Sequence, residues 1–361
     1  MYRPTASGVK VIVPSLFKTA KFAEAEDKAE FIGFMLVVLS TAAIRGDSPV
    51  PGFFRFDPSK FNTGDVTLGA GITITTDSGG VAALDGDVTF NDKIDGGNTL
   101  TIDSGDGDVK LQGVVGGGSA TGISGLSINT NDETGTIEIT DIGDADSLGV
   151  TGTVAIGNSA TATLTLDGTK YFTDGGTTFE ASSGGSGILI TGASPTISTK
   201  NDALAFNTAD IVLSTAGTTT IDTEHTATGA GTLTIAGKID ATSGEAENLI
   251  INAGSAKITL QGAIGSGSTG KVADLTIGSV GAGAIDVFQI GSSSVVGASG
   301  TTAIGNSSTG TLTLDGTIYS TTGSQTYTAA TGGKNIVVAS TGSGAVAITT
   351  SNAAVNFLVS D

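Results

Sequence analysis

Short apolar–polar–apolar triplets recur along the chain from Val66 onward. Examples are Val88-Thr-Phe90, Leu100-Thr-Ile102, Val109-Lys-Leu111 and Leu164-Thr-Leu166. Because successive residues of a strand point to opposite faces, the outer two residues of each triplet face one core. Gly, Asp, Asn and Ser separate the triplets and supply turns. No helical apolar period is present beyond residue 60, so we predict an all-β fold there.

The same part of the chain contains an internal repeat. Ala155 to Tyr171 reads AIGNSATATLTLDGTKY and Ala303 to Tyr319 reads AIGNSSTGTLTLDGTIY, identical at 14 of 17 positions with an offset of 148 residues. The segment VKLQGVVG at Val109 likewise returns as ITLQGAIG at Ile258. We therefore predict two tandem copies of one unit, at about residues 67–213 and 214–361.

Two β architectures fit this pattern, and a parallel β-helix (β-solenoid) is favoured over tandem β-sandwiches. The predicted strands are very short and evenly distributed, aromatic residues are scarce, and the triplets cross the boundary between the copies without a linker. In one solenoid, Leu100 and Leu249 belong to turns of a single shaft. Tandem sandwiches place them in two closed cores instead.

Residues 1–63 form a different region, which we predict to be helical and irregular, while residues 64–361 form the solenoid. Residues 31–44 are uncharged, which suits the apolar part of a secretory signal, a buried or capping helix, or a membrane anchor. A spanning helix needs about 20 apolar residues, so this stretch is short for an anchor. We expect residues 9–60 to cover the N-terminal end of the solenoid, because an open end exposes unpaired backbone.

Charge and cysteine content narrow the function classes. Residues 1–60 carry a net charge of +2 and all three arginines, whereas residues 61–361 carry −21, which together give the −19 of the chain. An acidic region without arginine is unsuited to nucleic acid, because phosphate binding needs clustered Lys or Arg. The chain has no Cys, so it has no disulfide and no thiolate chemistry.

Two short motifs are candidate sites. Asp103, Asp106 and Asp108 place three carboxylates on one turn, and oxygen ligands of this kind suit Ca²⁺. The second copy has Asn252, Ser255 and Lys257 instead, so the fold does not need the metal. Arg45, Gly46 and Asp47 form a triplet that can engage integrins on an exposed loop, although such a triplet also arises by chance.

Other polar residues have structural interpretations. The second acidic cluster, Asp141, Asp144 and Asp146, has similar spacing and is also absent from the other copy. Lys93 and Asp95 recur as Lys238 and Asp240, two residues apart on one strand face, and an exposed pair contributes under about 1 kcal/mol. Asn158 and Asn306 are expected to build an internal polar ladder or to cap a turn. His225, the only histidine, reads as a surface residue.

The segment from Gly86 to Ser119 and its copy from Gly231 to Ser268 resemble the β-strand repeats of large bacterial surface proteins of the filamentous-haemagglutinin type. The resemblance covers about residues 67–361. It implies a β-solenoid stalk exported to the cell surface, often with an adhesive role. The chain departs from the family in being short and in lacking a recognisable two-partner-secretion domain at its start.

Three functions remain open from the sequence. The first is a non-enzymatic structural or adhesive protein, at the cell surface or extracellular, whose partners are glycans or proteins of a host or neighbouring cell, or other copies of itself. Membrane contact would come only through residues 31–44, and no cofactor is expected apart from Ca²⁺. The second is a viral or phage fibre, which predicts a trimer. The third is a polysaccharide-degrading β-helix enzyme, which requires convergent catalytic groups.

Overall fold

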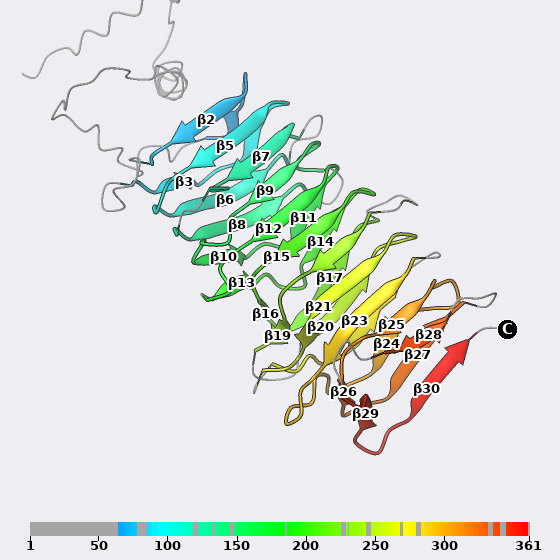
Figure 1. The fold of residues 1–361 in the computed structure, drawn as a ribbon. Coiled ribbons are helices and arrows are strands. Elements are labelled where there is room, and N and C mark those ends of the chain that lie inside the picture. The colour runs from blue at the N-terminus through cyan, green and yellow to red at the C-terminus, as the bar shows by residue number, and fades with distance from the viewer. Residues whose placement is uncertain are drawn as a thin grey trace, which may run out of the picture. The chain divides into compact units, whose positions relative to one another are not determined.

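The computed structural model describes residues 64–359, apart from residues 78–84, 118–121, 132–133, 145–147, 185, 225–228, 230, 243–246, 268–269, 279–282, 331–334 and 340–343. This part is all-β, without a helix, and every pair of its named strands is parallel (Figure 1). The chain coils into a β-solenoid, as predicted. The alternative of tandem β-sandwiches is wrong, because sandwiches are built from antiparallel pairs.

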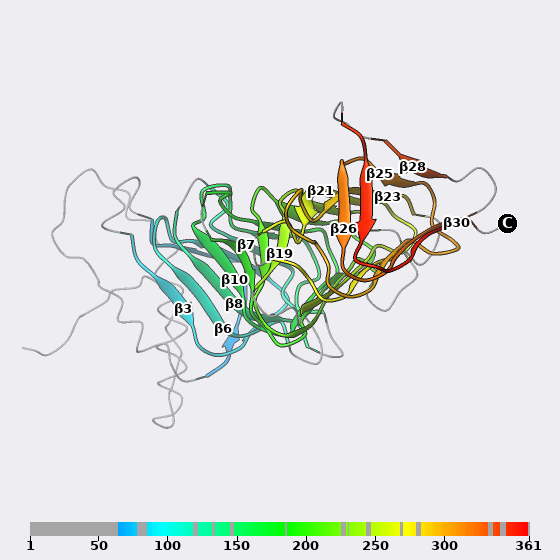
Figure 2. The same cartoon turned by 90° about the horizontal axis from the view of Figure 1, so that it is seen from below.

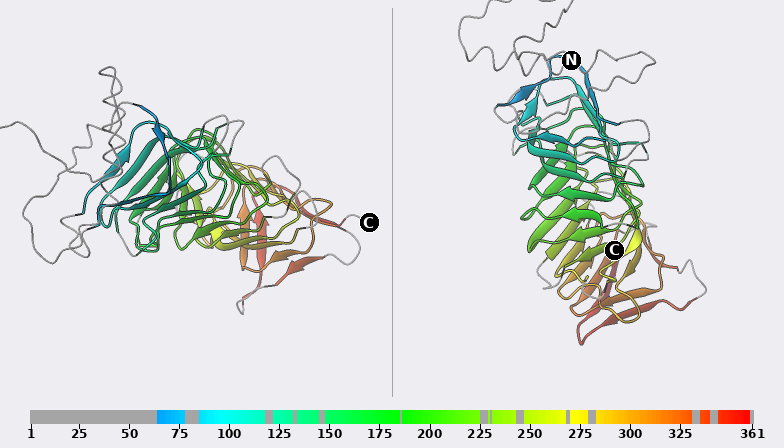
Figure 3. Two further views of the ribbon diagram at one scale, coloured as in Figure 1. Left: turned by 90° about the horizontal axis from the view of Figure 1, so that it is seen from above. Right: turned by 90° about the vertical axis from the view of Figure 1, so that its left-hand side faces the viewer.

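Each turn of the solenoid contributes one strand segment to each of three faces. Register partners on neighbouring turns are 21 residues apart at the shortest, between Val88 and Val109, and 30 at the longest, between Ile221 and Ile251. In all views the colours run in order from blue to red along the shaft (Figures 2 and 3). Contacts therefore join each turn to the turn before it and the turn after it.

Four longer strands bend around a corner and belong to two faces. They are β6 (Val109–Val115), β8 (Ile137–Ile142), β21 (Ile258–Ile264) and β23 (Ile285–Ile290). Face 1 holds the ends of β6 and β8 together with β1 (Val66–Thr67), β4 (Ile94–Asp95), β11 (Lys170–Thr173), β14 (Thr196–Thr199), β17 (Gly217–Asp222), β20 (Glu247–Asn252), β22 (Leu275–Ile277), β24 (Thr302–Ile304), β27 (Gln325–Ala329) and β30 (Val355–Val359).

The other two faces are built in the same way. Face 2 holds the beginnings of β21 and β23 together with β2 (Ile72–Thr75), β5 (Thr99–Asp103), β7 (Gly125–Ile128), β9 (Val154–Ile156), β12 (Thr177–Glu180), β15 (Leu204–Asn207), β18 (Leu233–Ile235), β25 (Leu312–Leu314) and β28 (Ile336–Val338). Face 3 holds the beginnings of β6 and β8, the ends of β21 and β23, and β3 (Val88–Phe90), β10 (Thr163–Leu166), β13 (Gly187–Ile190), β16 (Ile211–Leu213), β19 (Ile239–Ala241), β26 (Ile318–Thr321) and β29 (Ala347–Thr350).

The core is a set of stacked apolar columns along the axis. In β10 the outer residues of the triplet, Leu164 and Leu166, are buried while Thr165 between them is partly exposed. The register keeps inward residues above one another, and one column on face 1 comprises Val66, Ile94, Val115, Ile142, Tyr171, Ile197, Ile221, Ile251, Ile277, Ile304, Tyr327 and Phe357. Each fully buried Val, Ile or Leu contributes about 1.5–3 kcal/mol.

The sequence repeat and the turns of the solenoid are out of phase. Val109 begins β6 on face 3, whereas its equivalent Ile258 begins β21 on face 2. Tyr171 lies on face 1 and its equivalent Tyr319 on face 3. The second copy is thus displaced by one face relative to the first, and Leu100 and Leu249 share one shaft but lie on faces 2 and 1.

Glycines at the corners allow the bending strands to touch the preceding turn. The register shifts between Leu111 and Val114 in β6, and between Leu260 and Ala263 in β21. A Cβ on the intervening Gly262 would lie 2.1 Å from the carbonyl oxygen of Gly237, and one on the equivalent Gly113 would lie 2.2 Å from a backbone carbon of Asp92. Only glycine fits at this position of both copies.

Candidate functional site

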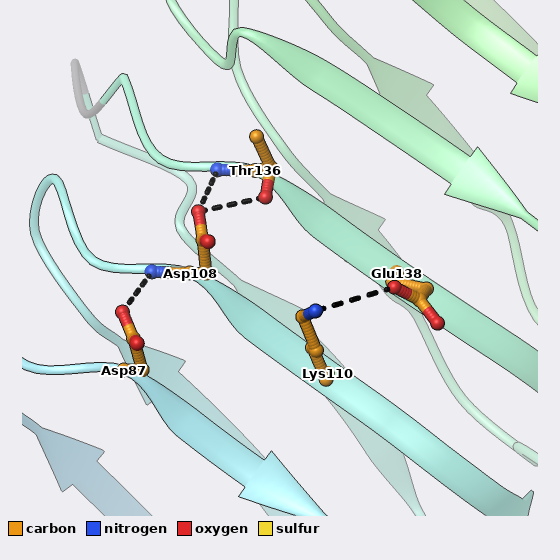
Figure 4. A network of polar contacts seen from close by, with 5 residues as sticks. All are labelled: Asp87, Asp108, Lys110, Thr136 and Glu138. Atoms are coloured by element: carbon orange, nitrogen blue, oxygen red, sulfur yellow. Dashed lines mark hydrogen bonds and ion pairs between the residues drawn. The ribbon is translucent and has the colours of Figure 1, made fainter.

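Two of the three predicted calcium ligands join one turn of the solenoid to the next. Asp106 and Asp108 lie in the turn between β5 and β6, after Asp103 at the end of β5. An oxygen of Asp108 accepts hydrogen bonds from the backbone nitrogen of Thr136, at 3.0 Å, and from its hydroxyl, at 2.7 Å (Figure 4). The backbone nitrogen of Asp108 in turn donates to Asp87, at 2.9 Å.

A parallel ladder runs two residues earlier in the chain. The backbone nitrogen of Asp106 donates to Asp85 at 2.9 Å, and the carboxylate of Asp106 accepts from the backbone nitrogen and hydroxyl of Thr134 at 2.9 and 2.8 Å. These carboxylates satisfy amide groups that precede the face 3 strands, and bonds to a charged acceptor are stronger than neutral ones. Their contacts give Asp106 and Asp108 a structural role between turns.

The contacts do not bring the three carboxylates together as a ligand set. The Oδ1 atom of Asp103 is buried and has no hydrogen-bond partner among the described residues. Within the described ranges, no group of three or more Asp, Glu, His or Cys side chains is arranged to hold a metal ion. Calcium binding at Asp103, Asp106 and Asp108 thus stays a prediction of the sequence.

The same use of aspartate recurs along the shaft. Asp141, from the second acidic cluster, accepts from the backbone nitrogens of Thr169 and Lys170, both at 2.8 Å. Farther along the shaft, Asp210 and Asp274 accept in the same way from the backbone nitrogens of Lys238 and Thr301. Aspartates at the turns are therefore part of how this solenoid is held together. Asp146 lies outside the described residues.

The sequence carried a signal for this role that the calcium hypothesis overlooked. Immediately before the face 3 strands β3, β6 and β8 the chain reads DGDV at Asp85, DGDV at Asp106 and TGTI at Thr134. Acceptor and donor side chains thus stand at matching places on three consecutive turns. Spacing of this kind indicates turn-to-turn pairing, whereas a metal site needs ligands that converge on one point.

An internal polar ladder is present at the corner after face 2, as predicted for Asn158. Its side-chain nitrogen donates to the backbone oxygen of Asn129, one turn earlier, at 2.9 Å. Asn129 in turn bonds with Ser104, its Oδ1 accepting from the backbone nitrogen at 2.8 Å. Asn158 and Asn306 also cap their own turns, by accepting from Ala160 and Ser308.

The repeated tyrosines are inside the shaft. The hydroxyl of Tyr171 accepts from the backbone nitrogen of Gly168 at 2.8 Å and donates to the carbonyl of Ile139, one turn earlier, at 2.9 Å. Tyr319 makes the equivalent bonds to Gly316 and Val287. Burial raises the pKa of both phenols well above the ordinary value of tyrosine. The LDGTxY motif is thus a turn closed by a buried phenol.

The Lys–Asp pair recurs at equivalent positions of the two copies, but the two lysines form different ion pairs. Lys93 pairs with Asp95 at 2.8 Å and with Asp65 at 3.4 Å, and the hydrogen bond with Asp95 raises the pKa of Lys93. Lys238 pairs instead with Asp210 on the neighbouring turn, at 3.7 Å. Both lysines are partly exposed, so neither pair adds much stability.

A shallow hollow of about 540 Å³ lies around the corner that β21 and β23 turn. Its lining includes the Asp210–Lys238 ion pair, the amides of Gln261 and Gln289, and the ring of Phe288. The Gln289 side chain donates to the backbone oxygen of Gly291 at 2.8 Å. The lining can offer hydrogen bonds and an apolar ring to a ligand. The charges of Asp210 and Lys238 offset each other, so these two side chains add no net charge to the hollow.

Several sequence hypotheses lie outside the described residues. These are the Arg45, Gly46 and Asp47 triplet, the alternatives for residues 31–44, the N-terminal segment 1–63 with its proposed cap, and His225. In the part that the structure describes, no helix has the length and apolar character needed to cross a membrane.

Comparisons of the chain with family models, curated proteins and solved structures gave no match. The resemblance to filamentous-haemagglutinin-type repeats is supported as far as the β-solenoid fold, and family membership is not shown.

Proposed function

We propose that this protein is a non-enzymatic structural or adhesive shaft, displayed on a cell surface or built into an extracellular matrix. The observation that carries the proposal is the unbroken stacking of the described turns, with the inward column of face 1 in register from Val66 to Phe357. A shaft of this construction resists bending and supports load, because each strand between the first and last described turns is bonded to the turn before it and the turn after it.

The outer surface of face 2 supports the adhesive part of the proposal. Its outward column consists mainly of small or hydroxyl side chains that the register places one above another. The column comprises Thr73, Thr101, Ser127, Ala155, Thr178, Ala205, Thr234, Thr259, Asp286, Thr313 and Val337. Strands lie about 4.8 Å apart, so these groups form a regular row. Such a row can approach a glycan or protein surface closely.

The proposal is tested by locating the protein and measuring its adhesion. Antibodies against the shaft should label intact source cells, and added protease should remove the labelling without lysis. Beads coated with the full chain should bind cell-surface glycans or matrix proteins more than beads coated with an unrelated acidic protein. A protein that is protected from protease until lysis, or that turns over acidic polysaccharides, would contradict the proposal.

A further inference from the structure

The last turn of the described shaft exposes large apolar side chains, and the register partners of all of them except Leu358 are buried one turn earlier. The large apolar side chains that are exposed in the described residues all belong to β28 and β30: Val338, Val355, Phe357, Leu358 and Val359. Phe357 is 48% exposed, whereas Tyr327, its register partner on β27, is fully buried. The Phe357 ring stacks on Tyr327 at 5.1 Å between centroids, and no described ring covers its other side.

The backbone edge of this turn is open as well. β30 pairs with β27, and no described strand pairs with its other edge; Figure 1 shows it as the outermost strand at the red end. Proteins commonly blunt such edges with Lys, Pro or a bulge. β28, β29 and β30 contain no charged residue and no proline.

Charge points to the kind of partner that this end accepts. Residues 335–359 contain no Asp, Glu, Lys or Arg, in a chain whose formal net charge is −19. The first described turns carry Asp65, Asp77, Asp85 and Asp87. Two copies of so acidic a chain repel each other along most of their surface. The strands of this end carry no charged side chain between Lys334 and Asp361, so they are where two copies can approach with the least repulsion.

We propose that the end formed by β28, β29 and β30 docks onto the same end of a second copy, so that two shafts join across a two-fold axis. The two-fold axis is perpendicular to face 1. A rotation of 180° about it places face 1 of the second copy in line with face 1 of the first, and places faces 2 and 3 of the second copy in line with faces 3 and 2 of the first. The two β30 strands then pair antiparallel, and β28 meets β29 of the second copy. Phe357 is the central residue of β30, so the two Phe357 rings meet at the axis.

The first test is the mass of the purified full chain by sedimentation equilibrium. The wild type should be a dimer. Phe357→Asp places two like charges against each other in an apolar contact, and should raise the dimer dissociation constant at least tenfold. Thr165→Asp adds the same charge on β10 in the middle of the shaft and should leave the dimer unchanged. A monomeric or trimeric wild type overturns the proposal, as does a dimer that Phe357→Asp does not weaken.

The second test distinguishes a two-fold dimer from head-to-tail stacking. The chain has no Cys, so Asn356→Cys introduces a single thiol beside Phe357. In the two-fold arrangement the two copies of residue 356 are diagonal neighbours, about 7–8 Å apart, within reach of a short bis-maleimide. A covalent dimer is expected, and Thr165→Cys should give none. Polymers that grow with concentration but do not cross-link at residue 356 would refute the two-fold arrangement.

Discussion

At the scale of single residues, the shaft depends on polar groups that link one turn to another. Tyr171 and Tyr319 stand at equivalent places in the repeat, yet on different faces, and both keep the same pair of backbone partners. The LDGTxY motif therefore forms the same turn on whichever face it lies. This explains why the segments around these tyrosines are the most similar part of the two copies.

Removing one of these hydroxyls should destabilise the fold. Tyr171→Phe leaves the nitrogen of Gly168 without its partner, inside the shaft, and removes one of the two donors to the carbonyl of Ile139, which keeps its bond from the nitrogen of Asp167 at 3.2 Å. We expect the free energy of unfolding in urea to fall by about 1–3 kcal/mol, and Tyr319→Phe to behave alike. Thr165→Val, on the outer surface of β10, should change it by less than about 0.5 kcal/mol. Equal stability of Tyr171→Phe and wild type would show that the hydroxyl bonds contribute nothing.

The same phenols predict how stability depends on alkaline pH. Burial raises the pKa of Tyr171, Tyr319 and Tyr327 in the folded state, while an unfolded tyrosine titrates near 10. Above about pH 10 the unfolded state loses these protons first, so stability present below pH 10 is lost as the pH rises. Tyrosinate absorbance of these three should appear together with unfolding in circular dichroism. Ionisation in the folded protein with an ordinary pKa would contradict their burial.

At the scale of elements, the corners and turns specify the path of the chain. Gly262→Ala would place a Cβ against the backbone of Gly237, which cannot move away as a flexible side chain could. We expect the free energy of unfolding to fall by about 1–3 kcal/mol. Gly176→Ala is the matched control, because the nearest atom to its new Cβ lies at 3.8 Å, an ordinary contact. Similar losses for both variants would mean that the corner does not need glycine.

The aspartate ladder makes a prediction that separates structure from calcium. Asp108→Ala removes the acceptor for Thr136 and should cost about 1 kcal/mol, whereas Asp108→Asn keeps an acceptor oxygen and should cost less. Thermal unfolding with Ca²⁺ and with a chelator measures both effects. If Ca²⁺ raises the midpoint of the wild type and both variants lose that increase, the carboxylate serves as a metal ligand.

These elements also show what the sequence could and could not predict. The triplets identified the strands and their buried residues, because a two-residue period follows from strand geometry alone. The assignment of the strands to three faces could not be predicted, because the turns vary from 21 to 30 residues in length and the sequence repeat does not correspond to a whole number of turns. The partners of Asp106 and Asp108 were missed for the same reason: they lie 28 residues along the chain, at a distance that only the coiling makes short.

At the scale of the whole molecule, the phase difference between repeat and turn has a consequence for any surface feature present in both copies. A side chain that points outward from face 2 in the first copy points outward from face 1 in the second, as Ser127 and Thr276 do. The two copies therefore present equivalent surfaces in different directions. A partner that touches one side of the shaft contacts non-equivalent parts of the two copies.

The phase difference also predicts which deletions the shaft tolerates. Deletion of residues 155–302 joins Val154 to Ala303, the equivalent of Ala155, and lets β24 stack on β7 in place of the equivalent strand β22. Equivalent segments of the two copies have the same corners and turns although they lie on different faces. Each strand that follows the deletion should therefore shift to the neighbouring face and still pack. We expect a shorter shaft with an all-β circular dichroism spectrum and a cooperative unfolding transition.

Deletion of residues 155–315 is the control. It ends at a non-equivalent position, Gly316, and removes β25 as well. That variant should aggregate or unfold without cooperativity. If both variants fold equally well, or if the in-register deletion is the one that fails, then the faces are not interchangeable and the fold is specified by position along the shaft.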